Sequence, residues 1–310
     1  MSETRFHDRR AVQIQNDDVC VTVTVEGGHI AEIRHKASGV NPLWIPPWPS
    51  IEPSAYDPHA NPEYGSDAES KLLAGIMGHN LCLDLFGAPS REEAAAGITV
   101  HGEASVVGYD IAASSTAFTA RCTMPIAQLA FKRNVRLAGR RVLFTETVEN
   151  LSALDRPIAW TQHVTLGPPF LDPHSTQFRF PSVKSSELSD FFTTHLMNPE
   201  QERAWFWAWS PATQALIGYV WRRSDFPWLG IWREDHGRTH PPWNGQALTR
   251  GMEFGVSPFP ESRRQMIDRR TLFDTPCYRW IPAGCKLTVG YYAAIGQAPA
   301  IPETLAEFEA

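Results

Sequence analysis

Residues 19–33 read VCVTVTVEGGHIAEI, and this stretch decides the fold class. Valine alternates with cysteine or threonine over residues 19–25, which is the two-residue period of a β-strand. Gly27 and Gly28 then turn the chain, and residues 29–35 return as a second strand. The stretch therefore predicts an antiparallel pair of strands near the start of the chain.

The same period recurs along the chain, whereas helical periodicity is rare. Further strands are predicted at residues 117–122, 127–137, 141–149, 177–180, 215–221, 229–232, 251–256 and 286–293. A short glycine-containing turn at residues 137–140 joins two of them as a hairpin. Helices are expected only at residues 90–96 and 303–309. Because helices do not alternate with the strands, the pattern predicts an all-β, mainly antiparallel sandwich that forms one domain over residues 1–310.

The composition excludes several classes of protein. The 310 residues carry a net charge of −6 and offer no basic stripe that would displace counterions from phosphates, so we expect no nucleic-acid partner. No apolar run approaches the ~18 residues that a membrane span needs, and the polar residues 1–10 do not resemble a secretory signal. The five cysteines are scattered and odd in number, which is typical of reduced thiols. These features predict a cytoplasmic protein without a membrane span or a disulfide framework.

The chain has 11 tryptophans, and many of them lie in short groups along the sequence. The groups are Trp44 and Trp48; Trp205, Trp207 and Trp209; and Trp228, Trp232 and Trp243. One interpretation is packing at the rims of sheets. The other is a concave site lined by aromatic faces, which suit the apolar face of a sugar ring. The proline-rich residues 42–62 form an unusually long connection, and we expect such a segment to cover a site.

Polar residues that suit acid–base chemistry occur in four clusters, which the pattern places at strand ends. The clusters are residues 78–80 (GHN), 100–103 (VHGE), 160–167 (WTQHVTLG) and 251–255 (GMEFG). Glu253 has an apolar neighbour on each side, so a strand would direct its carboxylate to the opposite face from both. Imidazoles and carboxylates titrate near neutral pH once they are partly buried. The clusters therefore indicate a site for proton transfer.

In their order and spacing, these clusters resemble the aldose 1-epimerases and other members of the galactose mutarotase-like superfamily. Residues 27–33 resemble the opening strand-turn-strand of that family, and residues 78–80 lie where the family carries Gly-Arg-Asn. His101-Gly102 resembles its Leu-His-Gly motif. Residues 148–150 (VEN), followed by His163, resemble the strand that leads to its catalytic histidine. The correspondence extends over roughly residues 19–293.

Three residues of the family, the glutamate base, the arginine and the sugar-binding aspartate, can be compared with positions of this sequence. Glu253 lies on a late strand, where the family has its glutamate base, but Phe254 stands where a proline commonly follows. His79 replaces the arginine of the family motif. The sugar-binding aspartate of the family has Asp235 as its nearest candidate, with Glu234 as the rival.

The resemblance implies a β supersandwich and an enzyme that interconverts sugar anomers without metal or organic cofactor. It implies that Glu253 is the base, that His163 is the acid toward the ring oxygen, and that His101 assists beside it. His79, Asn80 and Asp235 would hold sugar hydroxyls, and Trp44, Trp228 and Trp232 would supply the aromatic floor. The chemistry agrees, because ring opening removes one proton from the anomeric hydroxyl and delivers one to the ring oxygen.

Two alternative functions remain compatible with the sequence. The first is a non-catalytic carbohydrate-binding or sensing protein on the same fold. The second is a metal-dependent sugar isomerase or lyase that uses His79, His101, His163 and Glu253 as ligands, although no local spacing such as HExxH preorganises a metal site. The expected partner is a small sugar or sugar derivative, and the expected state is a monomer or homodimer. Arg233, Arg250, Arg263 and Arg264 are candidates for contact with an anionic sugar.

Overall fold

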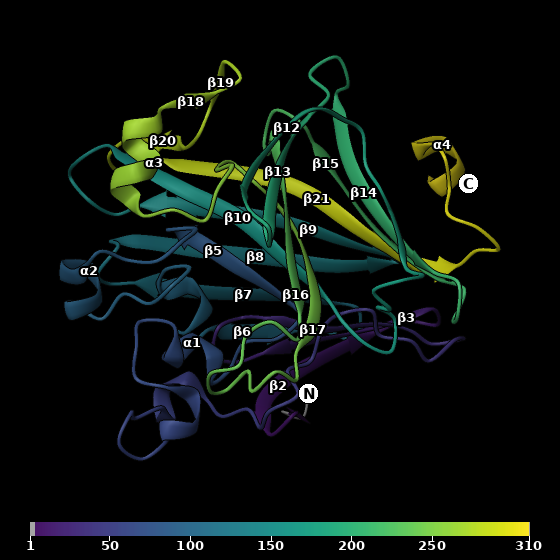
Figure 1. The fold of residues 1–310 in the computed structure, drawn as a ribbon, viewed down its shortest axis with the longest axis horizontal. Coiled ribbons are helices and arrows are strands. Elements are labelled where there is room, and N and C mark those ends of the chain that lie inside the picture. Colours follow the sequence, from purple (N-terminus) through teal and green to yellow (C-terminus); the bar gives the residue numbers. More distant parts are fainter. Residues whose placement is uncertain (1–3, 310) are drawn as a thin grey trace.

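Two large antiparallel sheets make up most of the computed structural model, which describes residues 4–309 (Figure 1). The 11-stranded sheet contains, in spatial order, β1 (Thr4–Phe6), β2 (Arg9–Gln15), β3 (Val19–Thr24), β4 (Ile30–His35), β5 (His79–Asp84), β10 (Arg156–Leu166), β17 (Leu248–Gly255), β16 (Trp228–Asp235), β13 (Phe192–Met197) and β12 (Ser182–Ser189), with β20 (Arg279–Ile281) paired to β10. The 8-stranded sheet contains β11 (Gln177–Arg179), β14 (Arg203–Ser210), β15 (Ala215–Arg222), β21 (Lys286–Gln297), β9 (Arg141–Asn150), β8 (Leu129–Ala138), β7 (Ala117–Met124) and β6 (Asp110–Ala113). The predicted all-β class is confirmed.

A shared hydrophobic core joins the two sheets. Leu83, Trp160 and Phe254 of the 11-stranded sheet belong to the same buried cluster as Phe144 and Ile217 of the 8-stranded sheet. Along β8 and β9, buried side chains alternate with partly exposed ones, as expected where one face packs on the core and the other faces solvent. Every residue of β3 and β5 is buried, because both faces of the 11-stranded sheet are covered in this region.

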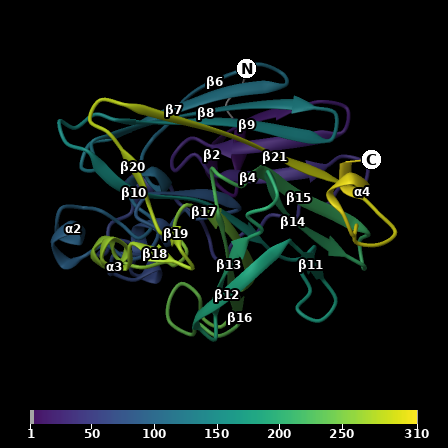
Figure 2. The same ribbon diagram turned by 90° about the horizontal axis from the view of Figure 1, so that it is seen from above.

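Helical segments are short, and the three helices labelled in both views, α2 (Arg91–Ala95), α3 (Arg263–Arg269) and α4 (Leu305–Glu309), lie at the ends of the sandwich (Figures 1 and 2). The other helical segments are η1 (Pro53–Ala55), η2 (Pro62–Tyr64), α1 (Ser70–Leu73) and η3 (Glu103–Ser105), and the two-stranded hairpin β18 (Thr271–Leu272) and β19 (Thr275–Pro276) follows α3. Helix α2 begins at a capping box, in which Ser90 and Glu93 each bond to the backbone of the other. In both views α2 and α3 lie at one end of the molecule and α4 at the other. No helix within residues 4–309 is long and apolar enough to cross a membrane.

The C-terminal segment explains one of the tryptophan groups. Trp205 and Trp207 stack on each other, and Phe308 of α4 stacks on Trp207 with ring centroids 4.7 Å apart. The indoles of Trp207 and Trp209 donate to the carbonyls of Pro302 and Ala298, both at 2.9 Å. These three tryptophans therefore anchor the end of the chain against the 8-stranded sheet. For this group, packing is the correct interpretation.

The polar clusters lie at or near strand ends, as predicted. His79 is the first residue of β5, whereas His163 and Glu253 lie within the last four residues of β10 and β17, and His101 lies in a turn. The central strand β10 was not among the predicted strands. Its residues 158–166 are buried on both faces, so the strand lacks the polar alternation on which period-2 reasoning depends.

Candidate active site

The register of three adjacent strands brings Asn80, His163 and Glu253 together. His163 of β10 lies directly opposite Glu253 of β17 on one side and Asn80 of β5 on the other. Residues in direct register share one face of a sheet. Their chain neighbours Gln162 and Phe254 face the core between the sheets, so the three site residues lie on the outer face of the 11-stranded sheet. The sheet therefore holds an imidazole, a carboxyl and an amide in one row.

The imidazole and the carboxyl are in contact. His163 Nε2 lies 3.1 Å from Glu253 Oε1, and the other ring nitrogen, Nδ1, lies 3.1 Å from Thr165 Oγ1. Glu253 Oε1 is buried, and apart from the 3.1 Å contact with His163 Nε2 it has no polar partner within the described residues. Both amide atoms of Asn80 are buried without a partner as well. Such atoms are costly unless a ligand or water binds them.

The glycines on either side of Glu253 make room for two neighbouring side chains, Glu253 itself at Gly251 and Thr161 at Gly255. Gly251 and Gly255 lie two residues away in each direction and therefore share its face. A Cβ atom at position 251 would lie far closer than 3.0 Å to Glu253 Oε1, and one at 255 would collide with Thr161 Oγ1 in the same way. The GMEFG pattern noticed in the sequence thus has a steric cause.

A tight turn places His101 over His163. His101 has a positive φ of 68°, which is uncommon for a residue with a side chain. Its Nδ1 lies 2.6 Å from the carbonyl of Phe86, and its backbone carbonyl accepts from Leu83 of β5 at 3.1 Å. The ring centroids of His101 and His163 are 4.8 Å apart. The turn is thereby tied to the strand that carries Asn80.

Burial sets the protonation of the three groups. Desolvation raises the pKa of Glu253 to about 8 and lowers the pKa of His101 to about 4. It also lowers the pKa of His163 well below its usual value, and the neighbouring His101 adds to this effect. At neutral pH, burial therefore favours the protonated form of Glu253 and the neutral form of both imidazoles. The roles assigned from the sequence, Glu253 as base and His163 as acid, require that proton to cross the 3.1 Å contact first.

These residues form the floor of a pocket of about 290 Å³. The lining side chains come from α1 and its flanks, the loop after β5, the strands of the sheet, and the hairpin loop between β16 and β17. They are Glu69, Leu73, Ile76, Gly87, Ala88, Val100, His101, His163, Phe192, Trp232, Arg238, Trp243, Glu253 and Pro260. The pocket thus combines an acid–base pair with apolar and aromatic walls, as small-molecule sites commonly do.

Two tryptophans line the same pocket as His163, and Trp232 is the one of them that was expected in the aromatic floor. They are Trp232 of β16 and Trp243 of the hairpin loop, whose rings meet edge to face at 6.0 Å. Trp44 stacks behind Trp243 at 6.1 Å and is buried, as is Trp48. The proline-rich segment that carries Trp44 and Trp48 therefore supports the pocket wall from behind.

Other predicted substrate-binding residues lie elsewhere. His79 faces the interior of the sandwich, where its ring nitrogens lie 3.0 Å from Gln162 Oε1 and 3.3 Å from Tyr219 OH. Trp228 is buried and donates to the carbonyl of Pro276 at 3.0 Å. The Asp235 side chain is 62% exposed beside His236. We therefore correct the interpretation of His79, Asp235, Trp228 and Trp44, none of which lines this pocket. Asn80 shares the sheet face of His163 but is fully buried and does not line the pocket either.

The register explains two of these corrections. His79 precedes Asn80, and Asp235 follows Glu234, so the members of each pair point to opposite faces of the sheet. Glu234 is the buried member of its pair. Because His79 faces away from His101, His163 and Glu253, the four suggested metal ligands do not converge. Among residues 4–309, no group of three or more histidine, cysteine, aspartate or glutamate residues is arranged to hold a metal ion.

Sequence reasoning missed Arg238 and Glu69. Arg238 lies over the ring of Trp243 at 4.6 Å and near that of Trp232 at 5.3 Å. Its Nη1 donates to Glu69 Oε1 at 3.2 Å. Arg238 lies in a loop without periodicity, and Glu69, one of its two ion-pair partners, is 169 positions away in the chain. No local pattern in the sequence indicates either residue.

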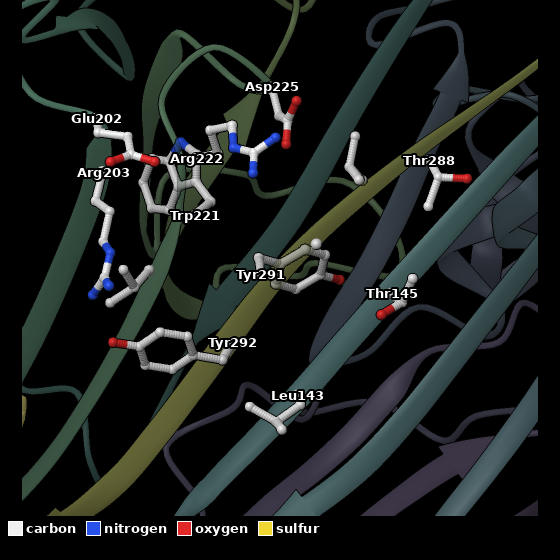
Figure 3. A pocket seen from close by; sticks show the side chains of 13 residues that line it. Leu143, Thr145, Glu202, Arg203, Trp221, Arg222, Asp225, Thr288, Tyr291 and Tyr292 are labelled. Carbon is white, nitrogen blue, oxygen red and sulfur yellow. The ribbon is translucent and has the colours of Figure 1, made fainter.

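Larger grooves lie on the outer face of the 8-stranded sheet, away from the acid–base pair. Figure 3 shows one of about 520 Å³, with Arg203, Arg222 and Asp225 toward one end and Thr145 and Thr288 toward the other. No histidine is among the residues that line it. The smaller pocket is therefore the better candidate for proton-transfer chemistry.

Solved structures with the same architecture come from several bacteria. A candidate aldose 1-epimerase from Klebsiella pneumoniae superimposes with a TM-score of 0.73 at 14% identity, over 94% of this chain and 80% of the other. A galactose mutarotase-like protein from Clostridium acetobutylicum gives 0.65 at 11% identity, over 96% and 98%. A galactose mutarotase related enzyme from Lactobacillus acidophilus gives 0.62 at 12% identity, over 93% and 97%. The chain therefore has the galactose-mutarotase-like fold, as the resemblance implied.

Sequence similarity does not identify a family for this chain. No family model matches the chain, and no curated protein matches it either. Because identities of 11–14% establish a shared fold and not a shared activity, the function has to be argued from the site.

Proposed function

We propose that this protein is an aldose 1-epimerase-like isomerase, which interconverts the anomers of a cyclic sugar by opening and closing its ring. The observation that carries the proposal is the His163–Glu253 contact of 3.1 Å at the floor of a pocket walled by Trp232 and Trp243. An imidazole and a carboxyl in contact supply one acceptor and one donor, and anomer exchange needs both. The sugar is the partner that the aromatic walls suit.

Ring opening needs one proton donor and one proton acceptor, and Glu253 and His163 can supply one each. With the proton on Glu253, its carboxyl donates to the ring oxygen while the neutral His163 accepts the proton of the anomeric hydroxyl. The bond between the anomeric carbon and the ring oxygen breaks, and the anomeric oxygen becomes a carbonyl. Rotation about the adjacent carbon–carbon bond and closure on the other face return both protons. If the proton first moves from Glu253 to His163, then His163 donates to the ring oxygen and Glu253 accepts the proton of the anomeric hydroxyl.

The remaining polar groups have supporting roles in this proposal. His101 donates through Nδ1–H to the carbonyl of Phe86, so the neutral ring offers Nε2 as an acceptor for a sugar hydroxyl beside His163. Asn80 flanks His163 in the row, and its unpartnered amide would bind a hydroxyl or an ordered water. No sugar atom needs a metal or organic cofactor for these transfers.

The proposal is tested by magnetization-exchange NMR on a panel of free and phosphorylated aldoses. We expect the protein to accelerate anomer interconversion of at least one sugar, and Glu253→Gln to reduce the rate by about 10²–10⁴-fold while the sugar still binds. Gln is the matched replacement because it keeps the shape of the side chain and removes the proton. Binding of a sugar without acceleration by the wild type would contradict the proposal and favour the carbohydrate sensor.

A further inference from the structure

One cation lines the pocket, Arg238, and it pairs with two carboxylates: Glu69, which also lines the pocket, and Glu234, which does not. Arg238 Nη1 donates to Glu69 Oε1 at 3.2 Å, and Arg238 Nε lies 3.4 Å from Glu234 Oε2. Glu234 Oε1 also accepts from the backbone N–H groups of Gly237 and Arg238, at 2.7 and 3.0 Å. The Glu234 side chain is only 4% exposed, so its charge is poorly screened by solvent. Together the three side chains carry a formal charge of −1.

The surroundings of this triad fix its position at the pocket wall. The guanidinium is stacked over the ring of Trp243 and lies near that of Trp232, so both aromatic walls hold it. Glu69 is the residue that precedes α1, and it lines the pocket as Arg238 does. The remaining titratable groups that line the pocket are His101, His163 and Glu253, whose contacts were described above. None of them supplies a positive charge while the imidazoles are neutral.

The other arginines that the sequence suggested for an anionic sugar are placed elsewhere. Arg263 makes a bidentate pair with Asp84, at 2.7 and 2.8 Å, and contacts Glu93 at 2.7 Å. Arg264 is exposed and pairs with Asp268. Arg233 and Arg250 face each other across β16 and β17, on the opposite face of the sheet from Trp232. None of the four is among the residues that line the pocket.

We propose that Glu69 and Glu234 act as specificity-determining residues, which restrict the pocket to uncharged sugars by neutralising Arg238. The inference rests on the proposed function and adds the class of substrate. A phosphorylated or carboxylated sugar would meet Arg238 with its charge offset by Glu69 in the pocket lining and by the buried Glu234, and it would have to displace a carboxylate to use the guanidinium. A neutral sugar meets no such cost and can accept hydrogen bonds from the same guanidinium edge. Rejection of a competitor by misplaced charge is a common source of specificity.

The test compares a free aldohexose with its 6-phosphate on the wild type, Glu69→Gln and Glu200→Gln. Gln removes the charge of Glu69 and keeps its shape. Glu200 lies on an exposed turn and does not line the pocket, so Glu200→Gln makes the same change in net charge elsewhere. Both the dissociation constant and the anomer-exchange rate are measured at low and high salt. Glu234→Gln, which keeps an acceptor for the two N–H groups, serves as a second variant.

We expect the wild type to prefer the free sugar, and Glu69→Gln to shift the preference toward the phosphate by about tenfold at low salt, because a nearby charge has been removed. The shift should shrink at high salt, and Glu200→Gln should show none. A wild type that binds the phosphate as well as the free sugar, or a Glu69→Gln preference equal to that of the wild type, would overturn the inference. The exchange rate reports separately on the proposed function, because the preference can be read from binding even where no sugar is turned over.

Discussion

Gly251 offers a sharp test, because a single added methyl group reaches the carboxyl group of the proposed catalytic pair. In Gly251→Ala, the new Cβ would lie far inside the 3.0 Å limit from Glu253 Oε1 and 3.1 Å from Trp232 Cβ. The obstructing oxygen is the end of a flexible side chain, so Glu253 can give way without moving the backbone. To regain an ordinary contact the carboxyl has to shift by about 1 Å, and misplacement of this size costs about 10²-fold in rate.

The same change should affect stability little. Replacing glycine by alanine restricts the unfolded chain, which stabilises a protein by about 0.4–1 kcal/mol and offsets the local strain. We therefore expect a free energy of unfolding within about 1 kcal/mol of the wild type, together with a rate reduced by about 10²-fold. Gly290→Ala is the matched control, because its Cβ would meet no atom closer than 3.7 Å. NMR exchange and urea denaturation measure the two quantities. A folded Gly251→Ala protein with the wild-type rate would refute the steric argument.

Three further predictions concern pH, the core and the aromatic walls. Burial raises the pKa of Glu253 to about 8 in the folded state, whereas the unfolded state loses this proton above the ordinary pKa of 4.5. The free energy of unfolding that depends on this group therefore falls as pH rises from about 4.5 to about 8. The unfolding free energy of Glu253→Gln relative to the wild type should therefore increase over that range, and a pH-independent difference would contradict the shift. His79→Leu should destabilise the protein by about 1–3 kcal/mol in denaturant titrations, because Gln162 and Tyr219 lose a buried partner, and it should leave sugar affinity unchanged. Trp243→Ala should weaken sugar binding by about tenfold in calorimetry, whereas Trp209→Ala, on the other sheet, should not.

The fold was predictable where one face of a strand is exposed. The hairpin of β8 and β9 was predicted within two residues at each end, because its buried side chains alternate with exposed ones. The same reasoning failed at β10, which is buried on both faces, so that its polar residues Thr161, Gln162, His163 and Thr165 do not alternate with apolar ones. Strand β14 failed for a related reason, since the C-terminal segment covers its outer face.

The sequence predicted the segments that form the site, but it did not always predict which residue of a segment faces the pocket. The glycines around Glu253 and the resemblance to a known family pointed to Glu253, His163 and His101, which the structure brings together. His79 and Asp235 were chosen from the right segments, but each lies one residue away from the side chain that faces the pocket side. A shift of one residue reverses the face of a strand. Arg238 and Glu69 meet only through the tertiary fold.

The central claim is that His163 and Glu253 act as one proton-exchanging pair, and a double-mutant cycle on the anomer-exchange rate tests it most directly. The rate is measured by NMR for the wild type, Glu253→Gln, His163→Asn and the double mutant, with sugar affinity followed in parallel. Because the two groups lie 3.1 Å apart and serve a single coupled transfer, each single change should cost about 10²–10⁴-fold. The double mutant should be little slower than either single mutant. Additive losses in the double mutant, or a wild-type rate in Glu253→Gln, would contradict the account.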